Sequence, residues 1–156
     1  TEDGGDPGAT SFAWDILLLC GNPADPSTYF AGFDKSQVSP ISCPDNLSFD
    51  TSGNLFIATD GAPGTWNGIF SPAPNDAIHA LPVEGSRRGQ VKQLLSGVVA
   101  CEVSSLLVAD QDRVLFASIQ HPGEGSTLAA TTSTWPGGTP RPAVVAVTKK
   151  GRRIGS

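Results

Sequence analysis

An aspartate and an asparagine, Asp45 and Asn46, stand directly before a short apolar strand, and they are the residues best placed to do chemistry. The residues after them alternate between apolar and polar, residues 50–54 form a glycine-containing turn, and residues 55–58 supply a second apolar strand. This pattern predicts a β-hairpin with a carboxylate at the start of its first strand. Carboxylate and amide oxygens bind hard cations such as Ca²⁺, so a metal-dependent function is the first hypothesis. The alternative for Asp45 is a turn carboxylate that initiates the strand.

Four further residues near predicted strand ends are candidates for the same site. Glu102 precedes the first strand of a later hairpin and is a second candidate metal ligand. Glu124 follows the end of that hairpin as another candidate ligand, and His121 beside it could orient a ligand through a hydrogen bond. The alternative for Glu124 is a surface glutamate in a strand-ending turn. Arg141 offers a bidentate fork for phosphate, although an arginine in a loop is more often simply solvated.

The remaining acidic, histidine and cysteine residues are interpreted as structural. Four aspartates in predicted turns are expected to make local turn hydrogen bonds: Asp50, Asp60, Asp110 and Asp112. His79 lies between apolar residues and is expected to be structural. The three cysteines have no zinc-site spacing, and an odd number cannot all pair within one chain. They are expected to be small buried residues: Cys20, Cys101, and Cys43, which is two residues before the candidate ligand.

The composition favours an all-β fold. Only 16% of the 156 residues are charged, while 18 glycines and 13 prolines indicate short strands joined by many turns. A net charge of −5 and a pI near 4.8 argue against a nucleic-acid partner and are compatible with cation binding. The apolar run at residues 16–20 is too short to span a bilayer, so no membrane association is expected.

Strands are expected along most of the chain, and no glycine-rich phosphate loop, Gly-x-Ser-x-Gly elbow or histidine-rich zinc site is present. The expected elements are a buried strand at 11–20, a short strand at 29–33, hairpins at 47–59, 78–95 and 106–119, and a last strand at 143–148. Residues 61–76 read as an irregular loop that contains Trp66. Pro82 favours an edge strand, because proline cannot donate to a sheet.

The first and third hairpins share a plan: an acidic residue, an apolar strand, an aspartate-containing turn and a Leu-Phe strand. Repeated hairpins of this kind are typical of β-propellers, whose four-stranded blades aim residues at a central channel. The sequence therefore predicts an all-β, β-propeller fold. The number of strands is enough for about two blades, so the chain is expected to be a piece of a larger propeller or to find its partner blades on another chain.

Several short motifs together resemble the C-terminal part of the PhoX-type alkaline phosphatases. They are, in chain order, Ser11–Asp15, Gly21–Pro23, Ser42–Leu47, Gln120–Glu124, Ser133–Pro136 and Pro140–Pro142. The resemblance covers nearly the whole chain, and the ending Ile154-Gly155-Ser156 also looks like that family's C-terminus. Glu102 matches a family glutamate, although the Gly-Pro that follows it in the family is absent here.

The resemblance implies a fold, an activity and a location. Members are β-propellers, typically exported bacterial enzymes, that hydrolyse phosphate monoesters with calcium and iron ions (Ca²⁺ and Fe³⁺) in the propeller channel. It implies that residues 1–156 are the C-terminal portion of such a domain, in the periplasm or secreted. The family's iron-bound cysteine belongs to the N-terminal half, so the chain is expected to show little or no phosphatase activity alone. The alternatives are a non-catalytic module that binds calcium or a partner, and a lactonase-like propeller hydrolase.

Overall fold

The computed structural model describes residues 3–61 and 75–155, and the expected loop with Trp66 lies largely outside these residues. Three short 3₁₀ helices are present: η1 (Asp3–Gly5), η2 (Lys35–Gln37) and η3 (Gly85–Arg87). The nine described strands are β1 (Leu18–Leu19), β2 (Tyr29–Phe30), β3 (Pro44–Phe49), β4 (Asn54–Thr59), β5 (Ala77–Pro82), β6 (Lys92–Ser96), β7 (Glu102–Ala109), β8 (Val114–Gln120) and β9 (Ala143–Thr148). No described helix is long and apolar enough to cross a membrane.

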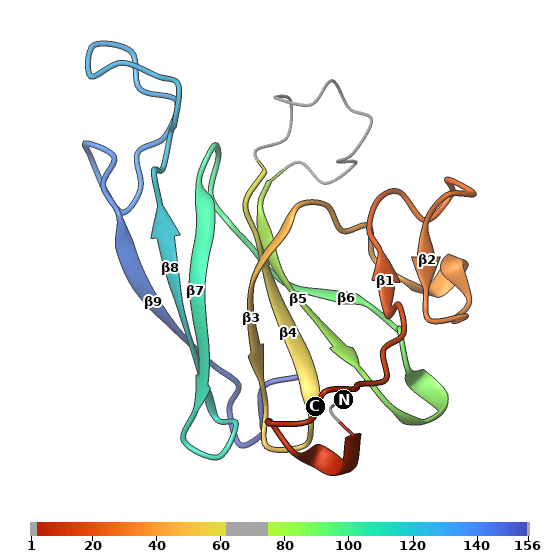
Figure 1. Cartoon of the computed structure of the whole chain (residues 1–156). Helices are drawn as coiled ribbons and strands as arrows, with labels where there is room; N and C mark the ends of the chain where they lie inside the picture. The colour runs from red at the N-terminus through yellow and green to blue at the C-terminus, as the bar shows by residue number, and fades with distance from the viewer. Residues whose placement is uncertain (1–2, 62–74, 156) are drawn as a thin grey trace.

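The described strands form three antiparallel sheets, in the orders β1-β2, β3-β4-β5-β6 and β7-β8-β9. Figure 1 shows the two larger sheets side by side, with the inner strands β3 and β7 as neighbours. The three predicted hairpins and the last strand are confirmed, because alternating apolar residues and turn residues fix both the strands and their register. The all-β prediction is likewise confirmed.

Strand β4 is the centre of the packing because it is buried on both faces. Phe56 and Ala58 point into a core that the second sheet completes with residues such as Leu115. Leu55 and Ile57 point the other way, into a core completed by the N-terminal segment. The first sheet is therefore a middle layer, and its strand ends are held from both sides.

Two expectations about the strands are wrong. Residues 11–20 do not form one buried strand: only Leu18–Leu19 belongs to a described strand, and Phe12 and Trp14 are exposed. An apolar run alone does not specify a strand when no neighbouring strand covers it. Pro82 is not on an edge strand, because β5 lies between β4 and β6. It is the last residue of β5, where the missing N–H interrupts no further pairing.

Some of the residues expected to be structural have the expected role, and others do not. Asp50 caps its turn by accepting hydrogen bonds from the backbone N–H groups of Ser52 and Asn54, at 2.9 and 2.8 Å. Asp112 is instead buried and accepts hydrogen bonds from Thr51 in the other hairpin, so its interpretation as an ordinary turn residue is wrong. All three cysteines are free thiols, of which Cys101 is buried and the other two are half-buried.

Candidate metal centre

Three carboxylates meet at one end of the inner strands. Oxygen atoms of Asp45, Asp60 and Glu102 all lie within 4.8 Å of one another. Asp45 is near the start of β3, Asp60 follows the end of β4, and Glu102 begins β7. Because β3 and β4 are antiparallel, the start of one and the end of the other lie together. The backbone N–H of Asp60 donates to the carbonyl of Cys43 at 3.1 Å and holds this end of the hairpin closed.

Two β-bulges aim the side chains at this end. The pairing of β3 with β4 shifts between Pro44 and Leu47, so Asp45 and Asn46 stand outside the regular ladder. The pairing of β7 with β8 shifts at Ser105, which has a positive φ of 46°. The side-chain oxygen of Asn46 accepts a hydrogen bond from the backbone N–H of Ser105 at 2.6 Å. This hydrogen bond links the bulge in β3 to the bulge in β7, so Asn46 connects the inner strands of the two sheets.

Gln120 orients Glu102. The two residues face each other across β7 and β8, and Gln120 Nε2 donates to Glu102 Oε2 at 2.6 Å. Gln120 Oε1 accepts a hydrogen bond from the hydroxyl of Ser104 at 3.0 Å, and its Nε2 lies 2.9 Å from His121 Nε2. These contacts fix the amide, so one carboxylate oxygen of Glu102 is held and the other is left for a ligand.

Asp76 places a further carboxylate at this end, below the surface. It is 3% exposed, and its Oδ1 accepts hydrogen bonds from the Thr59 hydroxyl at 2.8 Å and the Gly61 N–H at 3.1 Å. Its Oδ2 is buried without a hydrogen-bond partner among the described residues. A buried carboxylate oxygen without a partner is costly unless a cation or water satisfies it.

The electrostatics of this end favour a bound cation. Burial raises the pKa of Glu102, and the negative charges of Asp60, Asp45 and Asp76 raise it further, with His121 acting in the opposite direction. Burial also raises the pKa of Asp76, helped by the charges of Asp60 and Glu124. Carboxylates that repel one another in this way are stabilised as anions by a cation between them. An all-oxygen donor set suits Ca²⁺.

The thiol of Cys43 lies beside the group, and its surroundings favour the protonated form. Burial raises its pKa above the usual range, and the charges of Asp76 and Asp60 raise it further. A thiol with a raised pKa stays protonated at neutral pH, and the protonated form is unreactive.

The structure brings together some of the predicted site residues and not others. Asp45 and Glu102 share the group with Asp60, which the sequence indicated only as a turn residue. Glu124 is exposed, and although its charge acts on Asp76 it is not one of the three carboxylates. His121 reaches the group through Gln120. The side chain of Arg141 is exposed and makes no ion pair with a described residue.

Asp60 and Gln120 were missed because a bulge shifts the register of each hairpin by one residue. Counted outward from the turns, Asp45 would face Thr59 and Glu102 would face His121. In the structure Glu102 faces Gln120, and Asp60 comes one residue beyond the pair of Thr59 with Pro44.

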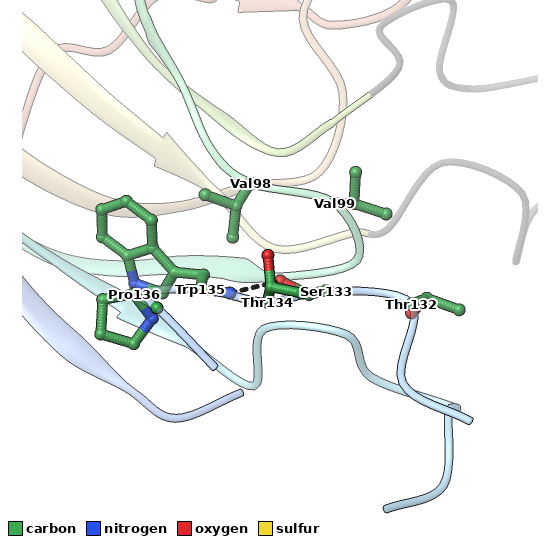
Figure 2. A pocket seen from close by; sticks show the side chains of 8 residues that line it. Val98, Val99, Thr132, Ser133, Thr134, Trp135 and Pro136 are labelled. Carbon is green, nitrogen blue, oxygen red and sulfur yellow. Dashed lines mark hydrogen bonds between the residues drawn. The ribbon is translucent and has the colours of Figure 1, made fainter. Parts of the chain in front are cut away.

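A pocket of about 420 Å³ lies on the segment that leads into β7. Figure 2 shows Val98 and Val99 facing the loop of residues 132–137, in which the Ser133 hydroxyl accepts a hydrogen bond from the Trp135 N–H at 3.2 Å. The carbonyl of Val99 also accepts a hydrogen bond from Gly123 N–H at 3.1 Å. This hydrogen bond joins the turn after β8, which carries His121, to the segment that leads into β7 and Glu102.

Comparisons with known proteins point to one family. A family model described as alkaline phosphatase PhoX matches residues 1–123. Among solved structures, the chain is similar to Pseudomonas fluorescens PhoX in complex with vanadate, a transition state analogue, with 31% identity and a TM-score of 0.67. The match covers 95% of this chain and 25% of that one, so the chain spans about a quarter of the relative's length. No similar protein was found among curated proteins. The predicted propeller fold of about two blades is confirmed.

Proposed function

Because this chain belongs to the PhoX family of alkaline phosphatases, we propose that it contributes to metal-dependent hydrolysis of phosphate monoesters. The observation that carries the proposal is the convergence of Asp45, Asp60 and Glu102 from three strand ends, in a chain that matches a vanadate-binding phosphatase. In this proposal residues 1–156 are the C-terminal portion of a β-propeller phosphatase domain. Export to the periplasm or the medium is part of the same proposal.

The residues present fit a cation. Asp45, Asp60 and Glu102 would hold it, and Asp76, whose Oδ2 has no hydrogen-bond partner among the described residues, adds negative charge beneath them. Ca²⁺ takes six to eight oxygen ligands, so waters, substrate oxygens or other parts of a PhoX-type protein would complete the shell. We assign calcium to this group and keep iron (Fe³⁺) as an expectation of the family. A bound cation supplies neutralisation of the phosphoryl oxygens during hydrolysis.

The other residues have roles that the chain's own contacts support. Gln120 holds Glu102 in place, and Asn46 holds the bulge that carries Asp45. In the proposal Glu124 adds a ligand and Arg141, exposed on its loop, meets the phosphate of the ester.

Calcium titration of the purified chain tests the metal centre directly. We expect saturable binding, measured by isothermal titration calorimetry, that is lost in the triple variant Asp45→Asn, Asp60→Asn, Glu102→Gln. Glu84→Gln is the matched control, because Glu84 is an exposed glutamate whose side chain makes no capping hydrogen bond at η3. Equal calcium binding by the triple variant and the wild type would remove the site assignment.

Activity and metal content distinguish the phosphatase from the alternatives. The 156-residue chain alone is expected to turn over little or no p-nitrophenyl phosphate, and robust turnover would contradict that expectation. In a longer PhoX-type protein that includes this chain, iron together with calcium supports the phosphatase. Calcium alone favours the binding module or the lactonase-like enzyme, and no metal at all contradicts the metal centre.

A further inference from the structure

A basic pocket lies at the end of the sheets opposite to the candidate metal centre. Its volume is about 360 Å³, which is within the range of small-ligand sites. Figure 1 shows the turn between β7 and β8 and the segment after β9 together at this end. The described residues that line the pocket include four cations and one carboxylate: Arg113, Lys149, Arg152, Arg153 and Asp110. The pocket is therefore basic in a chain whose net charge is −5.

The strand register places like charges opposite one another in this pocket. Val114 on β8 pairs with Thr148 on β9, so Arg113 and Lys149 are the next residues outward on the two strands. Lys149 in turn pairs with Arg152 in an isolated antiparallel bridge. Like charges at facing positions destabilise a sheet, and an anion between them relieves the repulsion.

The basic segment after β9 is held in place by the core. Ile154 is 4% exposed and packs between the two larger sheets, and its N–H donates to the Asp112 carbonyl at 2.6 Å. Arg153 Nη1 lies 3.5 Å from Oδ2 of the same aspartate. The Arg152 N–H donates to the Lys149 carbonyl at 3.1 Å and closes the turn between them. A backbone that is already ordered loses less entropy on binding, so the segment is pre-organised for a ligand.

The side chains of the pocket match a phosphate group in chemistry and in charge. Three of the four cations are arginines, whose planar guanidinium groups bind phosphate through two parallel hydrogen bonds. Gln111 Oε1 accepts a hydrogen bond from Arg113 Nη2 at 2.8 Å and directs that guanidinium. Asp110 offsets one of the four positive charges, and the buried Asp112 beside Arg153 offsets another. The two that remain match a phosphate monoester group, which carries about −1.5 to −2 charges at pH 7.

We infer that this pocket binds a phosphate group through Arg113, Lys149 and Arg152. Free phosphate and the phosphate of a lipid headgroup present the same kind of oxygen atoms, and the test below separates these two sources. The site is distinct from the metal centre, because it lies at the opposite ends of the strands and contains no candidate metal ligand. The inference does not depend on phosphatase activity or on bound calcium.

Titration of inorganic phosphate into the isotope-labelled chain, followed by NMR, tests the inference. Low salt keeps the charges unscreened, and excess EGTA keeps calcium from the metal centre. We expect saturable amide shifts that are largest in the lining residues. The double variant Arg113→Gln, Arg152→Gln should raise the Kd roughly tenfold or more. The double variant Arg87→Gln, Lys92→Gln is the matched control, because it removes two exposed positive charges outside the pocket and should change the Kd less than about twofold.

Sedimentation with phosphatidic acid vesicles, compared with phosphatidylcholine vesicles, identifies the source of the phosphate. Binding to the acidic vesicles that is lost in the Arg113/Arg152 variant, without a response to free phosphate, would support the site with a lipid headgroup as its ligand. Lys149→Gln is a second variant, which should weaken binding severalfold if circular dichroism shows that the double variant is unfolded. Equal binding by the double variant and its control, or no binding of either probe, would overturn the inference. Because these titrations exclude calcium, their failure is distinguishable from failure of the metal centre.

Discussion

Acidic side chains at the two ends of the strands have opposite surroundings. At one end Asp45, Asp60 and Glu102 stand close together, and no arginine or lysine among the described residues forms an ion pair with them. At the other end one of the turn carboxylates, Asp112, is 2% exposed and accepts hydrogen bonds from Thr51. Asp112 lies in the turn between β7 and β8, whereas Asp45, Asp60 and Glu102 lie at the open ends of the two hairpins.

Asp112 is fully compensated. Its Oδ1 accepts a hydrogen bond from the Thr51 N–H at 2.9 Å, and its Oδ2 accepts one from the Thr51 hydroxyl. Arg153 Nη1 lies 3.5 Å from Oδ2, and the Ile154 N–H donates to the Asp112 carbonyl at 2.6 Å. The hydrogen bonds from Thr51 lower the pKa of Asp112, and the charge of Arg153 lowers it further. This carboxylate therefore joins the turns of both hairpins to the C-terminal segment.

The difference indicates which end is built for stability and which for binding. A buried carboxylate with donors on every side stabilises the fold, and removing it leaves those donors unpaired. At the acidic end burial and the neighbouring negative charges raise the pKa of Glu102, which disfavours its charged form in the folded chain and is typical of a group kept for what it binds. Removing an acid should therefore have opposite effects at the two ends.

The largest effect on stability is expected at the end that carries Asp112, whose carboxylate oxygens both accept hydrogen bonds. Asp112→Ala leaves the N–H and hydroxyl of Thr51 without their acceptor and separates the two turns. We expect the midpoint of thermal unfolding, measured by circular dichroism, to fall by roughly 10 °C. Asp45→Ala is the comparison, because it removes an exposed carboxylate from the opposite end and should change the midpoint little. Equal losses in the two variants would contradict the contrast between the ends.

A smaller effect on stability is expected at His79, which is buried in β5 between the two ends of the strands. Its Nε2 lies 3.0 Å from the Pro40 carbonyl, and burial lowers its pKa to about 4. The unfolded chain then binds more protons than the folded chain between pH 6.5 and pH 4, so stability falls as the pH falls through that range. We expect the free energy of unfolding to drop by about 2 kcal/mol from pH 7 to pH 5 through this residue.

Urea unfolding of the wild type and His79→Gln at both pH values isolates the effect. Glutamine does not titrate, so the variant should lack the drop even if it is less stable at every pH. The acidic group contributes equally to both proteins and cancels in the comparison. Parallel pH profiles for the two proteins would show that His79 is protonated as easily in the folded chain as in the unfolded one.

The hairpins were predictable because they depend on local signals. Alternating residues and glycine-containing or aspartate-containing turns specify β3–β4 and β7–β8 without knowledge of the rest of the chain. The strand expected at residues 11–20 failed because burial there depends on which neighbours the fold supplies, and Trp14 is 74% exposed. The position of β5 between two strands likewise depends on sheet order, which Pro82 alone did not indicate.

The sequence predicted the acidic chemistry of the candidate site but not all of its residues. Asp45 and Glu102 followed from their positions before strands and from family resemblance. Both Asp60 and Asp112 were interpreted as turn residues, yet Asp60 follows β4 and joins the acidic group, and Asp112 lies in the β7–β8 turn, buried beneath Thr51. The burial of Asp112 depends on a contact between the two sheets that connects residues about 60 positions apart, as between Thr51 and Asp112.

The smallest expected effect is a gain in stability rather than a loss, and it is expected in the group of Asp45, Asp60 and Glu102. Glu102→Gln removes one negative charge from a group whose members raise the pKa of Glu102, and keeps a side chain of the same shape. Without metal, we expect the midpoint of thermal unfolding to stay unchanged or to rise by a few degrees, as repulsion is relieved. With calcium present the wild type should gain stability and the variant should gain less, because binding to the folded state stabilises it. A lower midpoint for the variant without metal would mean that the hydrogen bond from Gln120 outweighs the repulsion, and the acidic end would then resemble the compensated one.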